Sequence, residues 1–446
     1  MTEGDGRTLS LFDATMLVVG GVIGVGIFFT PQAVAQRLPD AAPFFAAWII
    51  GGVLAAAGAL TFAELAATFP HAGGWYVYLR EAFGRLPAFL FAWVVLLVVS
   101  TGAAAVIGDF CASQIEALVF PDGVSRALHL SLGAALIIGI TGVALSGVKS
   151  GALLQNACTL LKLGALLAFL GGAFLVFEPA PPAAPAPPAT WSLGNLALAM
   201  LPVMFAYGGW HIVTYLGHAI RDPQRNLPRS MLLGTGLVVL VYVLVNAAFV
   251  RVLGMDGLAH EPNFAALMAR RTLGSVGGTL LIAAMAVSSL GVCTVILLGS
   301  PWVYVAMARD GLFFRSIGAV TPRTGAPANA LLLQGAISLV LVWAASYARD
   351  GFQAMVDYTA PVFWIFFLLT GVTLFVFRAR GGEPPAVRTP LYPLFPVVFC
   401  GMCAYMIYST VSYALADYGP KFGNMVLTGI VVMLAGIPLY LLARRK

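Results

Sequence analysis

The side chains that could do chemistry in this chain are few, and they lie inside long apolar runs. Lys162 lies within Thr159-Leu-Leu-Lys-Leu-Gly, and Asp109, Ser288 and Ser289 lie in two other apolar runs. A charge at bilayer depth is costly, so it faces the bundle interior and pairs with carbonyls or an opposite charge. We expect Lys162 to stand in for a bound cation or to take part in proton transfer, with a purely structural bridge as the alternative.

The other three polar residues are weaker signals. Asp109 pairs with a neighbouring polar group, which would allow a proton-linked role, or it lies at the outer interface; the residues leave both open. The hydroxyls of Ser288 and Ser289 are suited to lining a cavity at the membrane midplane.

Two glycine-rich stretches provide backbone chemistry. Gly20–Phe28 reads Gly-Gly-Val-Ile-Gly-Val-Gly-Ile-Phe, and Phe205–Trp210 reads Phe-Ala-Tyr-Gly-Gly-Trp. Each lies in the middle of an apolar run long enough to cross a bilayer. Glycine permits unusual backbone angles, and a helix opens in hydrocarbon only where its freed N–H and C=O groups line a cavity or meet a ligand. Two such openings predict a midplane substrate site between two broken helices.

Paired openings suit a zwitterion. Amides around Gly24–Gly26 would begin the outer half-helix and attract a carboxylate, while carbonyls near Val19–Gly21 and Phe205–Ala206 would accept hydrogen bonds from an ammonium. Phe205, Tyr207 and Trp210 would form a lid or stacking wall. The alternatives are close helix packing for the glycines and core or lipid packing for the aromatics. The predicted substrate-binding residues are Gly20, Gly21, Ile23, Gly24, Val25, Gly26, Phe205, Ala206, Tyr207, Gly208 and Trp210.

Composition sets the class of protein. With 446 residues, 60% hydrophobic and 9% charged, the chain is predicted to be an all-α polytopic membrane protein. Unbroken apolar runs exclude a β-barrel. Motifs for phosphate binding, zinc proteases and serine hydrolases are absent, so we expect no enzyme activity, no cofactor, no metal and no nucleic-acid partner. The five cysteines all lie in apolar runs, which indicates packing and no disulfide framework.

Twelve membrane spans are predicted. Of the 24 Lys and Arg residues, 16 fall in loops on the side of the N-terminus, seven fall in the opposite loops and Lys162 lies within a span. The positive-inside rule places both termini in the cytoplasm and the protein in the cell membrane, inner or plasma. The spans are 11–36, 43–68, 86–112, 128–146, 151–177, 193–217, 231–253, 275–306, 328–346, 353–378, 391–414 and 423–443.

A Pro/Ala-rich segment divides the chain. Residues 178–191 are predicted to form a stiff outer linker of polyproline-II type. It separates spans one to five, in residues 1–177, from spans six to ten, in residues 192–380; residues 381–446 add spans eleven and twelve. Spans one and six both break near their middle, which is typical of inverted repeats.

The sequence resembles the amino acid–polyamine–organocation transporter superfamily, in its L-type amino acid transporter-like branch. The resemblance rests on Gly21–Phe28, on Phe62–Gly84 with its Pro-His-Ala-Gly-Gly-Trp-Tyr-Val-Tyr-Leu-Arg-Glu-Ala-Phe-Gly, on Gln155–Leu163, and on Phe205–Trp210 through to Asp222-Pro-Gln-Arg-Asn-Leu-Pro-Arg. It implies a five-plus-five inverted repeat of the leucine-transporter type, with discontinuous helices one and six, helices eleven and twelve appended, and alternating access.

The resemblance also implies residue roles. Phe205 would be the lid, Gly208 would set the room for the substrate side chain, and Lys162 would bridge helix one to helix eight where sodium sits in sodium-coupled relatives. Two positions depart from the pattern: Val25 stands where many relatives have Ser, and His218-Ala219 stand where an acidic pair is usual.

The sequence therefore favours sodium-independent exchange or uniport of neutral amino acids, since no acidic residue lies beside either break. The alternative is a proton-coupled symporter or antiporter of amino acids or polyamines, with Lys162 or Asp109 titrating. A more remote alternative is a membrane receptor or intramembrane enzyme, but an enzyme would need a nucleophile–base pair at lipid depth. Because no outer cysteine is available for a disulfide-linked subunit, we expect no obligate partner.

Overall fold

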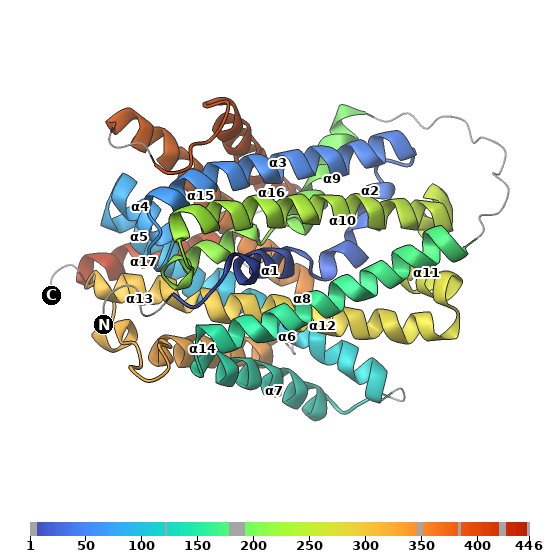
Figure 1. Cartoon of the computed structure of the whole chain (residues 1–446), viewed down its shortest axis with the longest axis horizontal. Helices are drawn as coiled ribbons and strands as arrows, with labels where there is room; N and C mark the ends of the chain where they lie inside the picture. Colours follow the sequence, from blue (N-terminus) through green and yellow to red (C-terminus); the bar gives the residue numbers. More distant parts are fainter. Residues whose placement is uncertain are drawn as a thin grey trace.

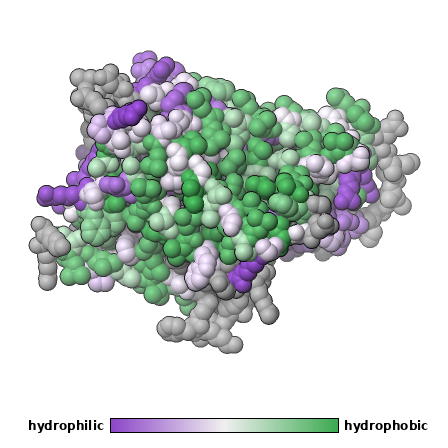
Figure 2. Space-filling model, turned by 90° about the horizontal axis from the view of Figure 1, so that it is seen from below, coloured by the Kyte–Doolittle hydropathy of each residue, from purple (hydrophilic) through white to green (hydrophobic). Residues whose placement is uncertain are grey.

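The chain forms a bundle of long helices with a broad apolar belt. The computed structural model describes residues 7–120, 123–177, 192–345, 351–381, 385–418 and 425–443. These residues form helices and turns, with two isolated β-bridges. Most helices run along one axis (Figure 1), and hydrophilic residues gather at the two ends of the molecule, with apolar residues between them (Figure 2). This distribution is that of a multi-pass membrane protein.

The helices before the linker are α1 (Leu11–Val22), the 3₁₀ turn η1 (Val25–Phe28), α2 (Thr30–Ala35), α3 (Ala41–Thr68), α4 (Trp75–Phe83), α5 (Arg85–Val94), the π-helical turn η2 (Val95–Val99), α6 (Ser100–Val119), α7 (Arg126–Leu145), α8 (Val148–Gly171) and the π-helical turn η3 (Gly172–Val176). The predicted linker, residues 178–191, lies outside the described residues.

The helices after it are α9 (Leu193–Ala206), the 3₁₀ turns η4 (Trp210–Tyr215) and η5 (Gly217–Ala219), α10 (Pro223–His260), α11 (Phe264–Leu273), α12 (Ser275–Gly299), α13 (Pro301–Arg309), the 3₁₀ turn η6 (Arg315–Gly318), α14 (Ala328–Ala345), α15 (Gly351–Arg380), α16 (Leu394–Tyr418) and α17 (Met425–Ala443).

The apolar helices agree with the predicted spans in place. Within the described residues, eight helical segments are long and apolar enough to cross a bilayer, and shorter apolar helices occur at Leu11–Val22, Leu193–Ala206, Ala328–Trp343 and Leu427–Ala443. The shorter ones fall on predicted spans one, six, nine and twelve. Helices α1 and α9 are short because each ends at a predicted break. The count of twelve spans stays a prediction.

Several boundaries differ from the predicted ones. Helix α10 begins at Pro223 instead of residue 231, since proline is well suited to the first turn of a helix. Predicted span eight is divided into α12 and α13 around Ser300 and Pro301. The C-terminal half of predicted span six consists of 3₁₀ turns.

The segment before α1 pairs with the segment after η5. The Leu9 amide donates to the Ala219 carbonyl at 2.9 Å, and the Arg221 amide donates to the Leu9 carbonyl at 2.9 Å. Nearby, the Gly73 amide donates to the Tyr215 carbonyl at 3.1 Å. We call this end of the bundle, where α1 begins and α17 ends (Figure 1), the terminal side. These backbone bonds hold its segments together.

Ion pairs join helices on the terminal side. They tie α1 to α8, α4 to α13 and α3 to α15, through Asp13–Lys149, Asp310–Arg80 and Glu64–Arg378, each at 2.7 Å. Glu64 also accepts a hydrogen bond from the Thr389 amide at 2.7 Å, so it anchors the loop before α16.

Candidate functional site

The first predicted break is present. Helix α1 ends with the Ile23 amide donating to the Val19 carbonyl at 2.8 Å. Gly24 is extended (φ −111°, ψ −153°), and the chain then enters η1 at Val25. The first amides of a helical turn have no acceptor within it, and the last carbonyls of α1 have no donor within α1. Amides without an acceptor in η1 and carbonyls without a donor in α1 therefore flank a two-residue gap.

The second predicted break is also present. Helix α9 ends at Ala206, and Tyr207–Gly209 form a turn before η4. Gly209 lies in the left-handed region (φ +114°, ψ −22°), which favours glycine. The Tyr207 amide still donates to the Val203 carbonyl and the Gly208 amide to the Phe205 carbonyl, both at 3.1 Å. The opening therefore begins after Gly208.

The two breaks touch each other through their glycines. A Cβ on Gly209 would overlap the Gly21 carbonyl oxygen and would lie 2.8 Å from its carbon. A Cβ on Gly26 would lie 3.5 Å from Cα of Ala206. Gly24, Gly26, Gly208 and Gly209 are nevertheless partly exposed, although most of their neighbours are buried. Bare backbone from both helices thus meets at one accessible place in the bundle.

Lys162 lies against the first break. Its ammonium, on α8, donates to the carbonyls of Ile23 at 2.7 Å and Gly20 at 3.1 Å, and to Ser288 of α12 at 3.3 Å. The Ser288 hydroxyl donates to the Ile23 carbonyl at 3.0 Å. Lys162 is 2% exposed, and its hydrogen-bond partners within the described residues are carbonyls. The ammonium therefore joins α1 to α12; its role in coupling stays a prediction.

Two other predicted residues lie away from this contact. The Ser289 hydroxyl donates to Met285 in its own helix at 2.7 Å, so the bridge is formed through Ser288. Asp109 lies 2.8 Å from Nε2 of His129, whose Nδ1 lies 2.7 Å from Glu116. Asp109 thus pairs with a polar neighbour that joins α6 to α7, and its proton-linked role stays untested.

Tyr242 of α10 was missed by the sequence analysis. Its hydroxyl lies 2.9 Å from the Val22 carbonyl and 3.0 Å from the Ala206 carbonyl, which are the last helical residues before the two breaks. Its ring packs on those of Tyr207, at 5.1 Å, and Trp48, at 5.7 Å. A tyrosine in an apolar run carries no spacing signal, so only the packing of α10 reveals that one hydroxyl links both breaks.

Replacing Tyr242 with phenylalanine should slow transport without unfolding the protein. The ring stays, but two buried carbonyls lose their shared donor, at a cost of about 1 kcal/mol or more. We expect a five- to tenfold lower exchange rate from a cost of that size. Uptake by reconstituted Tyr242→Phe, compared with Tyr408→Phe at a ring that is 70% exposed, measures the effect. Equal rates for Tyr242→Phe and the wild type would remove the linking role.

The predicted aromatic wall divides into buried and exposed parts. Trp210 packs on Phe62 with ring centroids 5.0 Å apart, and His211 lies 4.7 Å from Trp75. Tyr207 is also buried and donates to the Trp48 carbonyl at 3.1 Å. Trp210 and Tyr207 therefore pack in the core, whereas Phe205 is 47% exposed. Its role as a lid stays a prediction.

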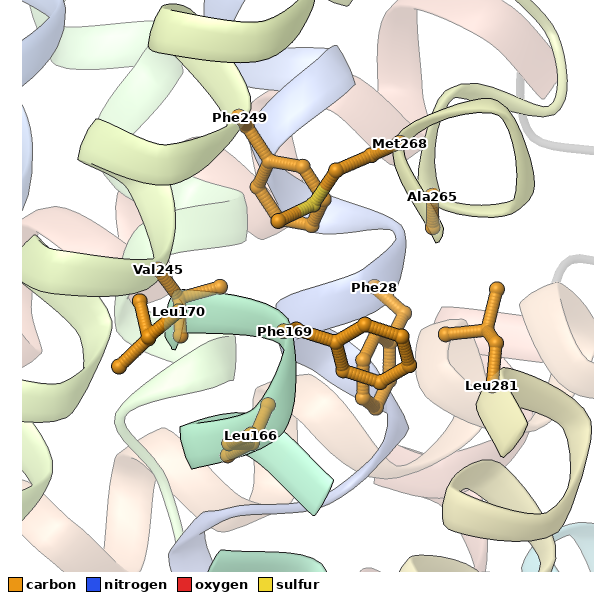
Figure 3. Close-up of a pocket in the computed structure, with 9 residues that line it drawn as sticks. All are labelled: Phe28, Leu166, Phe169, Leu170, Val245, Phe249, Ala265, Met268 and Leu281. Carbon is orange, nitrogen blue, oxygen red and sulfur yellow. The ribbon is translucent and has the colours of Figure 1, made fainter. Parts of the chain in front are cut away.

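An apolar cavity lies beyond the first break (Figure 3). Phe28 of η1 forms part of its wall, with side chains from α8, α10, α11 and α12 around it. The residues that line it are Phe28, Leu166, Phe169, Leu170, Val245, Phe249, Ala265, Met268 and Leu281. None of these side chains can hydrogen-bond a zwitterion, so the charged groups of a substrate have no partners there.

A second network missed from the sequence holds the start of α1. The Asp13 carboxylate accepts hydrogen bonds from Lys149 and Asn156 of α8, each at 2.7 Å, and from the Ser10 hydroxyl at 2.8 Å. Ser10 caps α1 by accepting from the Asp13 amide. The Ser-x-x-Asp spacing of a capping box was the signal that could have found this pair.

Comparison with known proteins identifies the family. A family model described as amino acid permease matches residues 9–435. The chain belongs to the amino acid permease family. The serine/threonine exchanger SteT of Bacillus subtilis (strain 168) is 28% identical over 445 residues, covering 98% of this chain and 98% of that protein.

Two mouse proteins have the same level of identity. The large neutral amino acids transporter small subunit 2 of Mus musculus is 28% identical over 448 residues, covering 98% of this chain and 81% of its own length. The Asc-type amino acid transporter 1 of Mus musculus is 28% identical over 447 residues, with the same two shares. Because these relatives are named transporters or exchangers, this permease is a transporter and not an enzyme.

The two positions expected to depart from the family pattern, Val25 and His218, differ in burial, since Val25 is buried and His218 is partly exposed. Val25 begins η1 and is 8% exposed. His218, in η5, has its ring centroid 3.8 Å from that of Trp302 on α13. A ring-on-ring contact between the partly exposed His218 and the buried Trp302 thus occupies this position.

Proposed function

We propose that this permease is a sodium-independent exchanger or uniporter of neutral amino acids. The substrate carboxylate binds the amides that begin η1, and its ammonium binds carbonyls at the ends of α1 and α9, each of which has a second lone pair beside the one that Lys162 or Tyr242 uses. The observation that supports this proposal is that the two broken helices meet through glycines whose backbone is partly exposed. Peptide groups at helix ends complement both charges of a zwitterion without charged side chains.

The Lys162 ammonium supports sodium independence. It donates to Gly20, Ile23 and Ser288 and so places an amino group among carbonyls that join two helices. Carbonyl and hydroxyl oxygens at such a point are also suitable ligands for a metal cation. Because an ammonium already uses these acceptors, a sodium ion would compete with it for the same oxygens.

Neutral substrates are favoured by the charges around the breaks. Neither Gly20–Phe28 nor Phe205–Trp210 contains an Asp or Glu whose carboxylate could attract a cationic side chain. The names of the relatives, a serine/threonine exchanger and a large neutral amino acids transporter, agree with this class.

The proposal includes a membrane layout. The twelve spans comprise two inverted five-helix halves followed by helices eleven and twelve, both termini are cytoplasmic, and the protein lies in the cell membrane. The terminal side would then be the cytoplasmic side. We also propose that the chain works without an obligate partner subunit, although one relative is named a small subunit.

Transport by the purified single chain in liposomes tests this proposal. Vesicles preloaded with unlabelled serine, leucine, arginine or glutamate are mixed with the labelled amino acid, in sodium buffer and in choline buffer. We expect counterflow of serine and leucine, equal rates in both buffers, and little uptake of arginine or glutamate. Uptake that collapses in choline would contradict sodium independence.

The same vesicles distinguish the proton-coupled alternative. If the carrier couples to protons through a site such as Asp109 and His129, an inward proton gradient drives accumulation of labelled substrate into vesicles that hold no amino acid. Pure exchange gives no accumulation under that gradient. Accumulation that disappears with a protonophore would therefore replace exchange by proton symport.

A further inference from the structure

Four exposed arginines lie together on the terminal side. Arg7 precedes α1, Arg221 precedes α10, and Arg225 and Arg229 lie in the first two turns of α10. The Arg221 amide donates to Leu9 at 2.9 Å and its Nε donates to the Arg7 carbonyl at 3.3 Å, which brings the two segments side by side. We call these four residues the arginine cluster.

The cluster continues into an apolar stripe of α10. Arg225 and Arg229 are one helical turn apart, and the same spacing leads to Leu233, which is 56% exposed. Leu240, 56% exposed, and Leu244, 38% exposed, continue this face toward the middle of the bundle. In a membrane span an exposed leucine faces lipid. Arg225 and Arg229 therefore lie where lipid headgroups would lie, directly above lipid-facing side chains.

The cluster lacks a protein counterion in the described part of the chain. Other terminal-side arginines are paired, as Arg80 is with Asp310 and Arg378 with Glu64. No carboxylate pairs with Arg225 or Arg229 among the described residues. The nearest acidic residue in sequence is Asp222, and its single negative charge is outnumbered by the four positive charges of the cluster. Cations at a helix N-terminus also oppose the helix dipole. An external anion would relieve both effects.

We propose that the arginine cluster binds an anionic phospholipid. Its phosphate would lie against Arg225 and Arg229, since guanidinium groups bind phosphate through paired hydrogen bonds. Its acyl chains would lie along Leu233 and Leu240. This site is independent of the proposed substrate and of the two breaks.

Equilibrium binding of short-chain lipids to the purified full-length protein tests the site. Dioctanoyl-phosphatidylglycerol is titrated against dioctanoyl-phosphatidylcholine, glycerol phosphate and inorganic phosphate. Each basic residue near an anionic lipid surface contributes roughly fivefold in affinity. Arg225→Gln/Arg229→Gln should therefore weaken phosphatidylglycerol binding about 25-fold and leave phosphatidylcholine binding unchanged, which also shows that the variant is folded. Added salt should weaken only the phosphatidylglycerol binding of the wild type.

Matched controls decide the outcome. Arg323→Gln/Arg388→Gln removes two exposed arginines from other loops and should keep the wild-type preference. An unchanged preference in Arg225→Gln/Arg229→Gln would overturn the site, and inorganic phosphate that binds as tightly as the lipid would make it a site for free anions instead. A preference seen only after Glu3→Gln/Asp5→Gln would mean that the chain's own acidic N-terminus neutralises the cluster, and this too would overturn the proposal.

Discussion

Transport should fall about a hundredfold or more when Lys162 is replaced with methionine. Methionine preserves most of the side-chain volume but removes the donor that the carbonyls of Gly20, Ile23 and Ser288 share, and among these the Ile23 carbonyl keeps the Ser288 hydroxyl as a donor. Each buried acceptor left unsatisfied costs about 1 to 3 kcal/mol. The cost falls on the contact between the first break and α12, so we expect loss of turnover to exceed loss of folded protein.

The measurement is counterflow in proteoliposomes that contain equal amounts of folded protein. Leu161→Ala is the matched control, because Leu161 precedes Lys162 in α8 and is 62% exposed. It should retain wild-type exchange. Wild-type exchange by Lys162→Met at equal reconstitution would show that the ammonium has no part in the transport cycle.

Gly209→Ala should abolish transport and lower the thermal stability of the protein. Alanine is strained at φ +114°, at a cost of roughly 1 to 3 kcal/mol. Its methyl group would also overlap the Gly21 carbonyl, where the two breaks touch. One break or the other must shift, so both the fold near the site and the proposed carbonyl positions change.

Two glycine variants separate this effect from a general intolerance of alanine. A Cβ on Gly208 would meet Phe205 O at 3.2 Å, so Gly208→Ala should fold and lose transport mainly of bulky substrates. A Cβ on Gly236 of α10 would extend into open space, so Gly236→Ala should change neither transport nor thermal stability. Thermal unfolding and counterflow with serine and leucine measure all three. If Gly209→Ala transports like Gly236→Ala, the contact between the breaks does not matter for function.

The openings in the two helices were predictable from the sequence because their cause is local. Glycines at Gly24 and Gly26, and at Gly208 and Gly209, interrupt runs that hydrocarbon would otherwise keep helical. The depth of Lys162 likewise predicted a buried ammonium that faces carbonyls or a carboxylate. The membrane class followed from composition, and the family from motifs that extend over most of the chain.

The partners of these groups were decided only by the tertiary structure. Lys162 meets Gly20 across 142 residues, and Tyr242 meets Val22 across 220. Such contacts depend on how long helices pack, and a period of 3.6 residues does not specify which face meets which neighbour. For the same reason Gly209 could be read as a point of helix opening but not as the residue that touches Gly21. Local backbone chemistry is encoded in short stretches, whereas the meeting of the two breaks depends on the whole bundle.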